Sequence, residues 1–257
     1  MTKKTLLRPL SRHWPRGPAW LDGDMVVMDG ARATFYQPLA EPSLGLELTS
    51  VTTPDAAVAF VQRFGLLHTA WEPSYQAAPA QLREPVERFI AAADDLRGII
   101  AIALDVRRAV DGNRDALARV RDRFGKVVAH HSGDKPDDRA ILIYASDWTA
   151  LGLSNGLAAA RPYVYDRAER GETVPPGRLR VGILPDTLRE VCYLTIAFQL
   201  ADKEPLGICP ECQRVFVIED GRQRFCTPAC ASRVRFRRFK TKQKEKRSRH
   251  GKTTRKG

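Results

Sequence analysis

Four of the five cysteines in this chain form two close pairs near its C-terminal end, and they constrain the fold more than any other feature. Two residues separate Cys209 from Cys212, three separate Cys226 from Cys230, and thirteen lie between the pairs. Cysteine pairs at such spacings are typical of a closed tetrahedral site in which four thiolates hold Zn²⁺. The first twenty residues contain no apolar run of the signal-peptide type, so we expect reduced thiols rather than disulfides. The sequence predicts one structural zinc ion on these four cysteines.

The residues around the cysteines predict a local fold that brings the two pairs together. The first pair forms a tight knuckle, and β-prone residues predict a strand over 214–218 and a returning strand over 223–226. Thr227 is a suitable helix N-cap and Pro228 suits the first helical position, which puts Cys230 in the first turn. The positive end of the helix dipole favours a thiolate there. This pattern predicts a small treble-clef-like or ββα finger whose folding depends on the metal.

The run CPECQRVFVIEDGRQRFCTPACASR resembles the CGNR-type zinc finger, in which a final Cys-Gly-Asn-Arg opens a basic helix. The resemblance implies that the four cysteines are the metal ligands and that Arg233 is the arginine closing the signature. Ala231 and Ser232 replace the Gly-Asn pair, so any role of those two residues is lost or altered. The resemblance is best over residues 185–240, because the preceding helical segment lies where the family's N-terminal domain, often called ABATE, ends. It implies a DNA-binding transcriptional regulator of bacterial type.

The excess positive charge of the chain is confined to its last 27 residues. Residues 231–257 contain 13 lysines and arginines and one acidic residue, whereas the first 230 residues contain 29 basic and 29 acidic side chains. The natural partner of such a charged segment is a polyanion, and guanidinium groups suit phosphate oxygens and guanine edges. We therefore expect this segment to bind nucleic acid. Its charge suits DNA and RNA alike, and the resemblance to the CGNR family favours DNA over RNA. The expected contacts are Arg233, Arg235, Arg237, Arg238, Lys240, Lys242 and Lys244.

A helix after Cys230 would sort its side chains onto separate faces. At 100° per residue, one basic stripe contains Arg233, Arg237 and Lys240, and Arg235 and Arg238 form another. Phe236 and Phe239 share a further face, and we expect them to pack against the rest of the protein. The polar residues 241–257 lack periodicity, so the sequence predicts a basic tail that is disordered until bound.

The remainder of the chain, residues 1–202, predicts an α+β body that is mainly helical. Helical periodicity runs over 54–64, 80–110, 113–124, 147–160 and 185–201, with Cys192 on an apolar face. Alternating or β-prone runs predict hairpins over 25–39 and 126–144 and strands over 44–51 and 178–183. The domain prediction is thus a body (1–202), a four-cysteine zinc finger with its basic helix (203–240) and a basic tail (241–257).

Three functions fit this organisation. The leading hypothesis is a zinc-dependent transcriptional regulator whose body senses a ligand or forms a homodimer. The second is an RNA- or ribosome-associated zinc protein, and the third is a body with enzymatic or small-molecule activity and a finger that clamps a partner. No P-loop, GxGxxG, HExxH or GxSxG pattern occurs, so we expect no enzyme. No apolar stretch is long enough to cross a bilayer, and we expect a cytoplasmic protein without membrane contact.

Overall fold

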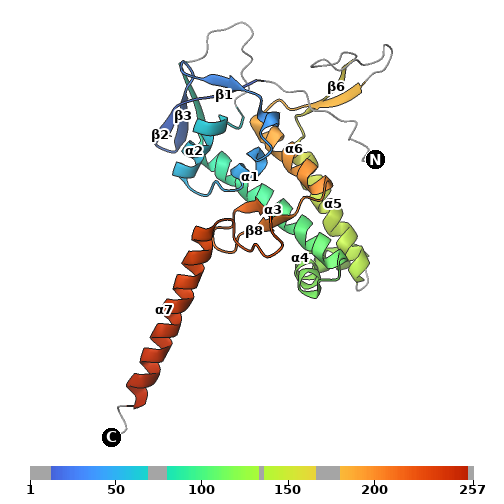
Figure 1. The fold of residues 1–257 in the computed structure, drawn as a ribbon. Coiled ribbons are helices and arrows are strands. Elements are labelled where there is room, and N and C mark those ends of the chain that lie inside the picture. The colour runs from blue at the N-terminus through green and yellow to red at the C-terminus, as the bar shows by residue number, and fades with distance from the viewer. Residues whose placement is uncertain (1–12, 69–79, 133–135, 166–179, 254–257) are drawn as a thin grey trace. The chain divides into compact units, whose positions relative to one another are not determined.

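A computed structural model describes residues 13–68, 80–132, 136–165 and 180–253 (Figure 1). The chain divides into two units, Met1–Lys203 and Glu204–Gly257. The described residues are mainly helical with short antiparallel sheets, which confirms the predicted α+β class. The helices are α1 (Leu44–Leu48), α2 (Pro54–Phe64), α3 (Val86–Val110), α4 (Arg114–Ser132), α5 (Asp138–Gly156), α6 (Leu188–Ala201), α7 (Pro228–Thr253) and the 3₁₀ turn η1 (Pro38–Ala40). The strands are β1 (Trp14–Arg16), β2 (Ala19–Asp22), β3 (Met25–Asp29), β4 (Thr34–Tyr36), β5 (Gln81–Pro85), β6 (Arg161–Tyr165), β7 (Arg180–Leu184), β8 (Leu206–Ile208) and β9 (Val215–Val217).

Helix α3 is the longest element of the first unit, and both α4 and α5 pack against it (Figure 1). Residues three or four positions apart on each helix point into one shared apolar cluster, as expected for amphipathic helices. Its buried members are Ile102, Val120, Phe124, Val128, Ile141 and Ala145. None of the described helices is long and apolar enough to span a membrane.

Nine of the fourteen residues of helix α6 are buried. A capping box begins it: the Thr187 hydroxyl accepts the Glu190 N–H, and the Glu190 carboxylate accepts the Thr187 N–H. Cys192 is fully buried, as predicted. Helix α1 lies against α6 at Gly45, where an added Cβ would come within 2.6 Å of the Cys192 carbonyl oxygen. This close approach therefore requires glycine.

The predicted hairpin over 25–39 is wrong in its pairing. Strand β3 pairs with β2 and β5 in a three-stranded antiparallel sheet, and β4 pairs instead with β1. The turn between β2 and β3 contains Gly23 at a φ of 63°, a conformation that glycine adopts without strain. Asp29 does form a turn, because its carboxylate accepts the N–H groups of Ala31 and Arg32, but that turn does not join paired strands.

The predicted hairpin over 126–144 is also wrong, because its expected strands lie in helices: residues 126–129 in α4 and residues 140–144 in α5. The buried residues of this region recur at helical rather than alternating spacing, and the Asp137 carboxylate caps α5 by accepting the Ala140 N–H. The predicted strand over 44–51 is largely α1, since its buried leucines face α6. The helix predicted over 80–110 begins only at Val86, and residues 81–85 form strand β5. Pro85 disfavours a helical conformation for the residue before it.

Candidate metal centre and basic helix

The four paired cysteines converge on one point of the second unit. Their ligand atoms all lie within 4.8 Å of one another. The Cys212 sulfur is 3.4 Å from that of Cys226 and 3.8 Å from that of Cys230, and the last two sulfurs are 3.7 Å apart. Zn–S bonds of about 2.3 Å in a regular tetrahedron separate the sulfurs by about 3.8 Å. The four thiolates therefore fit one zinc ion, and among the described residues no other group of three or more Cys, His, Asp or Glu does.

The first pair sits on a tight backbone turn. The Cys209 N–H donates to the Arg214 carbonyl and the Gln213 N–H donates to the Cys209 carbonyl, both at 2.9 Å. Gln213 adopts a φ of 60°, which reverses the chain directly after Cys212. Strand β9 follows this knuckle, as predicted from its β-prone residues.

The second pair is placed by the start of α7. Pro228 is its first residue, and the Thr227 hydroxyl accepts the Cys230 N–H at 3.3 Å. Cys230 is thus fixed in the first turn, only 4% exposed, as the capping pattern predicted.

The predicted returning strand over 223–226 does not form. Strand β9 pairs instead with β8, which precedes the knuckle, so the hairpin encloses the first cysteine pair and does not lie between the two pairs. The Gln223 side chain explains the difference: its carbonyl oxygen accepts the Glu219 N–H, and its amide donates to the Phe225 carbonyl. The Gln223 N–H also donates to the Asp220 carbonyl, so this stretch is held as a turn.

A small apolar cluster supports the cysteines from one side. Phe216 on β9 packs with Cys209 and Cys230, and Ile218 and Phe225 lie against them. A Cβ at Gly207 would lie 3.1 Å from the Phe216 ring, so the glycine lets this ring cover β8. The cluster is too small to hold the finger by itself, and metal binding is expected to contribute most of the folding free energy.

The surroundings of the sulfurs set which of them lose protons easily. Desolvation raises the pKa of Cys209, but hydrogen bonds from the backbone at Cys226 and Cys212 outweigh it and bring the pKa below its ordinary value. Desolvation raises the pKa of Cys212 and of Cys226, and the neighbouring thiols raise the pKa of Cys226 further. A metal ion must therefore displace protons from at least these two thiols when it binds.

Residues 206–243, which extend from strand β8 into α7, match the CGNR zinc finger family. The CGNR segment thus includes the β8–β9 hairpin, the knuckle and the first four turns of α7, and its four cysteines form a zinc-binding site. No curated protein matches the chain.

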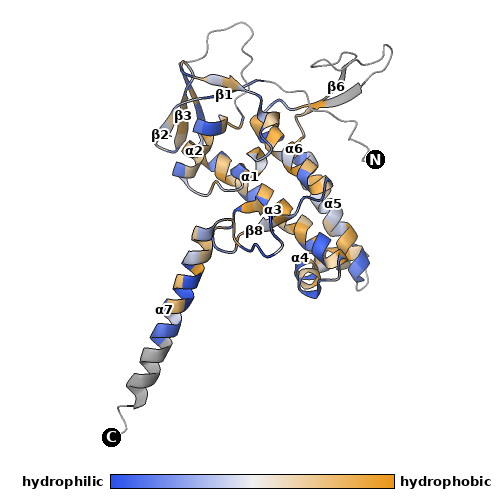
Figure 2. Cartoon of the chain, in the orientation of Figure 1, coloured by the Kyte–Doolittle hydropathy of each residue, from blue (hydrophilic) through white to orange (hydrophobic). Residues whose placement is uncertain are grey.

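All seven cations predicted to contact nucleic acid lie on α7 and are exposed. Helix α7 is largely hydrophilic in Figure 2. One cation has a partner that the sequence did not reveal: the Arg237 guanidinium pairs with the carboxylate of Glu211, which is 9% exposed within the knuckle. An acidic residue inside a knuckle that faces a basic helix is the signal that could have indicated this pair.

Two predictions for the C-terminal region are corrected by the structure. Phe236 and Phe239 are each 57% exposed rather than packed into a core. Helix α7 also continues to Thr253, where the sequence predicted disorder from residue 241. Residues 241–250 are mostly Lys, Arg, Gln and Glu, which propagate a helix well, and the first glycine is Gly251. Residues 254–257 lie outside the described part of the chain.

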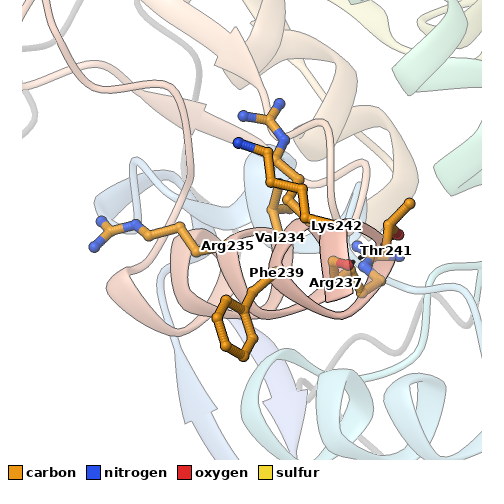
Figure 3. A pocket seen from close by; sticks show the side chains of 7 residues that line it. Val234, Arg235, Arg237, Phe239, Thr241 and Lys242 are labelled. Carbon is orange, nitrogen blue, oxygen red and sulfur yellow. Dashed lines mark hydrogen bonds between the residues drawn. The ribbon is translucent and has the colours of Figure 1, made fainter. Parts of the chain in front are cut away.

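A hollow on the surface of α7 is lined by basic and apolar side chains of the helix (Figure 3). In Figure 3 the side chains of Arg235, Lys242 and Phe239 extend away from the helix in different directions. Thr241 bonds back to the helix, its hydroxyl donating to the Arg237 carbonyl at 3.1 Å. The residues lining the hollow are Val234, Arg235, Arg237, Arg238, Phe239, Thr241 and Lys242.

Proposed function

We propose that this zinc-binding protein binds DNA through α7 and acts as a transcriptional regulator. The observation that carries the proposal is the row of exposed cations that begins one turn after a metal ligand. Cys230 is fixed by the Thr227 cap and the zinc site, and the first predicted contact, Arg233, follows three residues later. The zinc site thus gives the helix a rigid base, so that its charges are ordered before the partner arrives.

The charge distribution supports a polyanionic partner rather than a protein of mixed charge. Residues 231–244 carry seven cations and no acidic residue. Of these cations, Arg237 is paired with Glu211, and the others form the phosphate-binding set of this proposal. The first 230 residues carry equal numbers of basic and acidic side chains, so the positive electrostatic potential of the protein is concentrated on this helix.

The body completes the proposed regulator as a ligand-sensing or dimerisation domain without catalytic activity. Among the described residues, the one cluster of three or more metal-ligating side chains belongs to the finger and not to the body. Under this proposal, ligand binding or dimerisation of the body changes how α7 is positioned on DNA.

The salt dependence of DNA binding tests the proposal. The full chain is titrated into a fluorescent 20-base-pair duplex at several salt concentrations. If six cations each neutralise a phosphate, the plot of log affinity against log salt has a slope of about −5. A slope near zero removes the electrostatic mechanism. Tighter binding to an RNA stem-loop than to duplex DNA at the same salt concentration replaces the DNA proposal with an RNA-associated role.

A further inference from the structure

The side chains of α7 form four faces with different chemistry. At 100° per residue, Phe236 and Phe239 define one face, which we call the aromatic strip. A basic stripe lies about a quarter turn away on each side of it. The first stripe consists of Arg233, Lys240 and Lys244, and the second of Arg235, Arg238 and Lys242. Arg237 lies between the first stripe and Cys230 and pairs with Glu211 of the knuckle.

The fourth face is the one that the finger holds. Cys230 and Val234 lie on it, nearly opposite the aromatic strip, and Cys230 is buried at the metal site. Phe236 and Phe239 are each 57% exposed, and the Lys240 ammonium lies 4.7 Å from the centre of the Phe236 ring. The zinc site therefore holds the back of the helix and leaves the aromatic strip and both basic stripes outward.

Two exposed phenylalanines leave apolar surface in contact with water when the helix is unbound. Because a row of cations flanks them on each side, this surface is complementary to a groove with negatively charged walls. The major groove of B-form DNA is about 12 Å wide and an α-helix with its side chains is about 10–12 Å across. A helix lying in this groove meets a phosphate strand on each side and base edges at the floor. The major groove of A-form RNA is too narrow for side chains to read.

We infer that α7 lies in the DNA major groove with the aromatic strip against thymine 5-methyl groups and one basic stripe on each phosphate strand. This inference rests on the proposed DNA binding and adds a binding mode and a base preference to it. Apolar contact with the thymine methyl is one of the ways a base pair is recognised in the major groove. Phe236 and Phe239 are about 4.5 Å apart along the helix axis, so they can reach neighbouring base pairs.

Single-stranded nucleic acid is the less suitable occupant of this surface. A single strand has one phosphate backbone and would engage one basic stripe with its bases on the aromatic strip. The stripes flank the strip on both sides, which matches the two backbones of a duplex. The arrangement thus favours base-edge contact over base stacking.

Replacing thymine with deoxyuracil provides a direct test, because it deletes the methyl group and keeps the hydrogen-bonding edge. The full zinc-loaded chain is titrated into three 20-base-pair duplexes of alternating A·T, A·U and G·C sequence, and into single-stranded dT20. We expect tighter binding to A·T than to A·U, by about fourfold for each methyl group that a phenyl ring covers. Phe236→Ala with Phe239→Ala should bring the A·T to A·U ratio to one and leave the salt slope unchanged.

Alanine is the best helix former, so this variant keeps α7 intact, and Leu151→Ala, at an equally exposed apolar residue of α5, is the matched control. Equal binding of A·T and A·U by the unmodified chain overturns the inference and leaves salt-dependent DNA binding standing. Tighter binding to dT20 than to any duplex overturns it in favour of stacking. Absence of salt-dependent binding to every probe defeats the proposed function itself.

Discussion

The Glu211 carboxylate pairs with the Arg237 guanidinium, so the zinc knuckle holds α7 at a second position about two turns beyond Cys230. The carboxylate is nearly buried, whereas Arg237 is 66% exposed. Arg237 was predicted as a nucleic-acid contact, and this pairing gives it a role in orienting the helix that carries the other contacts.

We predict that Glu211→Gln weakens this connection without removing zinc. Because Arg237 is largely exposed, solvent screening limits the coupling to about 0.5–1 kcal/mol. A double-mutant cycle of Glu211→Gln and Arg237→Gln, measured by denaturant unfolding of the zinc-loaded chain, should show this coupling. The cycle of Glu211→Gln with Arg235→Gln should show none, and equal values in the two cycles would refute the pairing.

Replacement of any one of the four paired cysteines should abolish stoichiometric zinc binding. Cys226→Ser removes a sulfur that lies at tetrahedral spacing from those of Cys212 and Cys230. Elemental analysis after dialysis should find about one zinc per wild-type chain and much less in the variant. Cys192→Ala is the control, because Cys192 is buried in α6 and belongs to no metal-ligating group among the described residues. Loss of zinc in this control would contradict the assignment.

Two glycines on helices of the body should respond to alanine with opposite signs. At Gly156 an added Cβ would lie 1.8 Å from the ring of Tyr193, which is fully buried, so overpacking should cost about 1–3 kcal/mol. At Gly98, inside α3, an added Cβ would meet nothing within 4 Å, and alanine should stabilise the helix by about 0.5–1 kcal/mol. Urea unfolding followed by tryptophan fluorescence measures both changes. A stabilised Gly156→Ala variant would show that Tyr193 does not pack as described.

The buried Glu84 side chain should make the stability of the body depend on pH. Burial raises its pKa to about 7, although its carboxylate accepts the N–H groups of Leu67 and His68. A carboxyl with a raised folded-state pKa stabilises fully below the unfolded pKa of about 4.5, and this contribution is lost as the pH rises through about 7.

The measurement is the free energy of unfolding of wild type and of Glu84→Gln between pH 4.5 and 8. Relative to the variant, the wild type should lose about 3 kcal/mol over this range, the free energy that corresponds to the shift in pKa. The His68 ring lies 3.8 Å from the Glu84 carboxylate, and desolvation and nearby arginines lower its pKa. Both proteins therefore also carry His68→Gln, so that His68 does not titrate in either. A difference that does not change with pH would show that Glu84 titrates normally.

The finger could be predicted from sequence to the extent that its structure depends on neighbouring residues. The cysteine spacing, the Thr227 cap and the Pro228 start are local signals, and the structure confirms them. The returning strand could not be predicted correctly, because the Gln223 side chain bonds to backbone groups that a ladder would otherwise use. The exposure of Phe236 was missed because hydrophobicity alone does not distinguish a core residue from a contact surface.

In the body, long amphipathic helices were predictable and strand partners were not. The periodicity from Phe89 to Leu104 is sustained over several turns, so α3 was found. Strand β3 pairs with β5, more than fifty residues away, and no local signal encodes that choice. Short β-prone runs such as 126–129 take their structure from the helices they pack against.

The most direct test of zinc-dependent DNA binding compares the duplex affinity of the zinc-loaded chain with that of Cys226→Ser across a salt series. The zinc-loaded chain should bind with a log–log slope of about −5. The variant must order its helix during binding and should bind about tenfold more weakly or worse. Equal affinity of the two proteins at every salt concentration would contradict the claim that four sulfurs and one metal ion hold α7 ready for DNA.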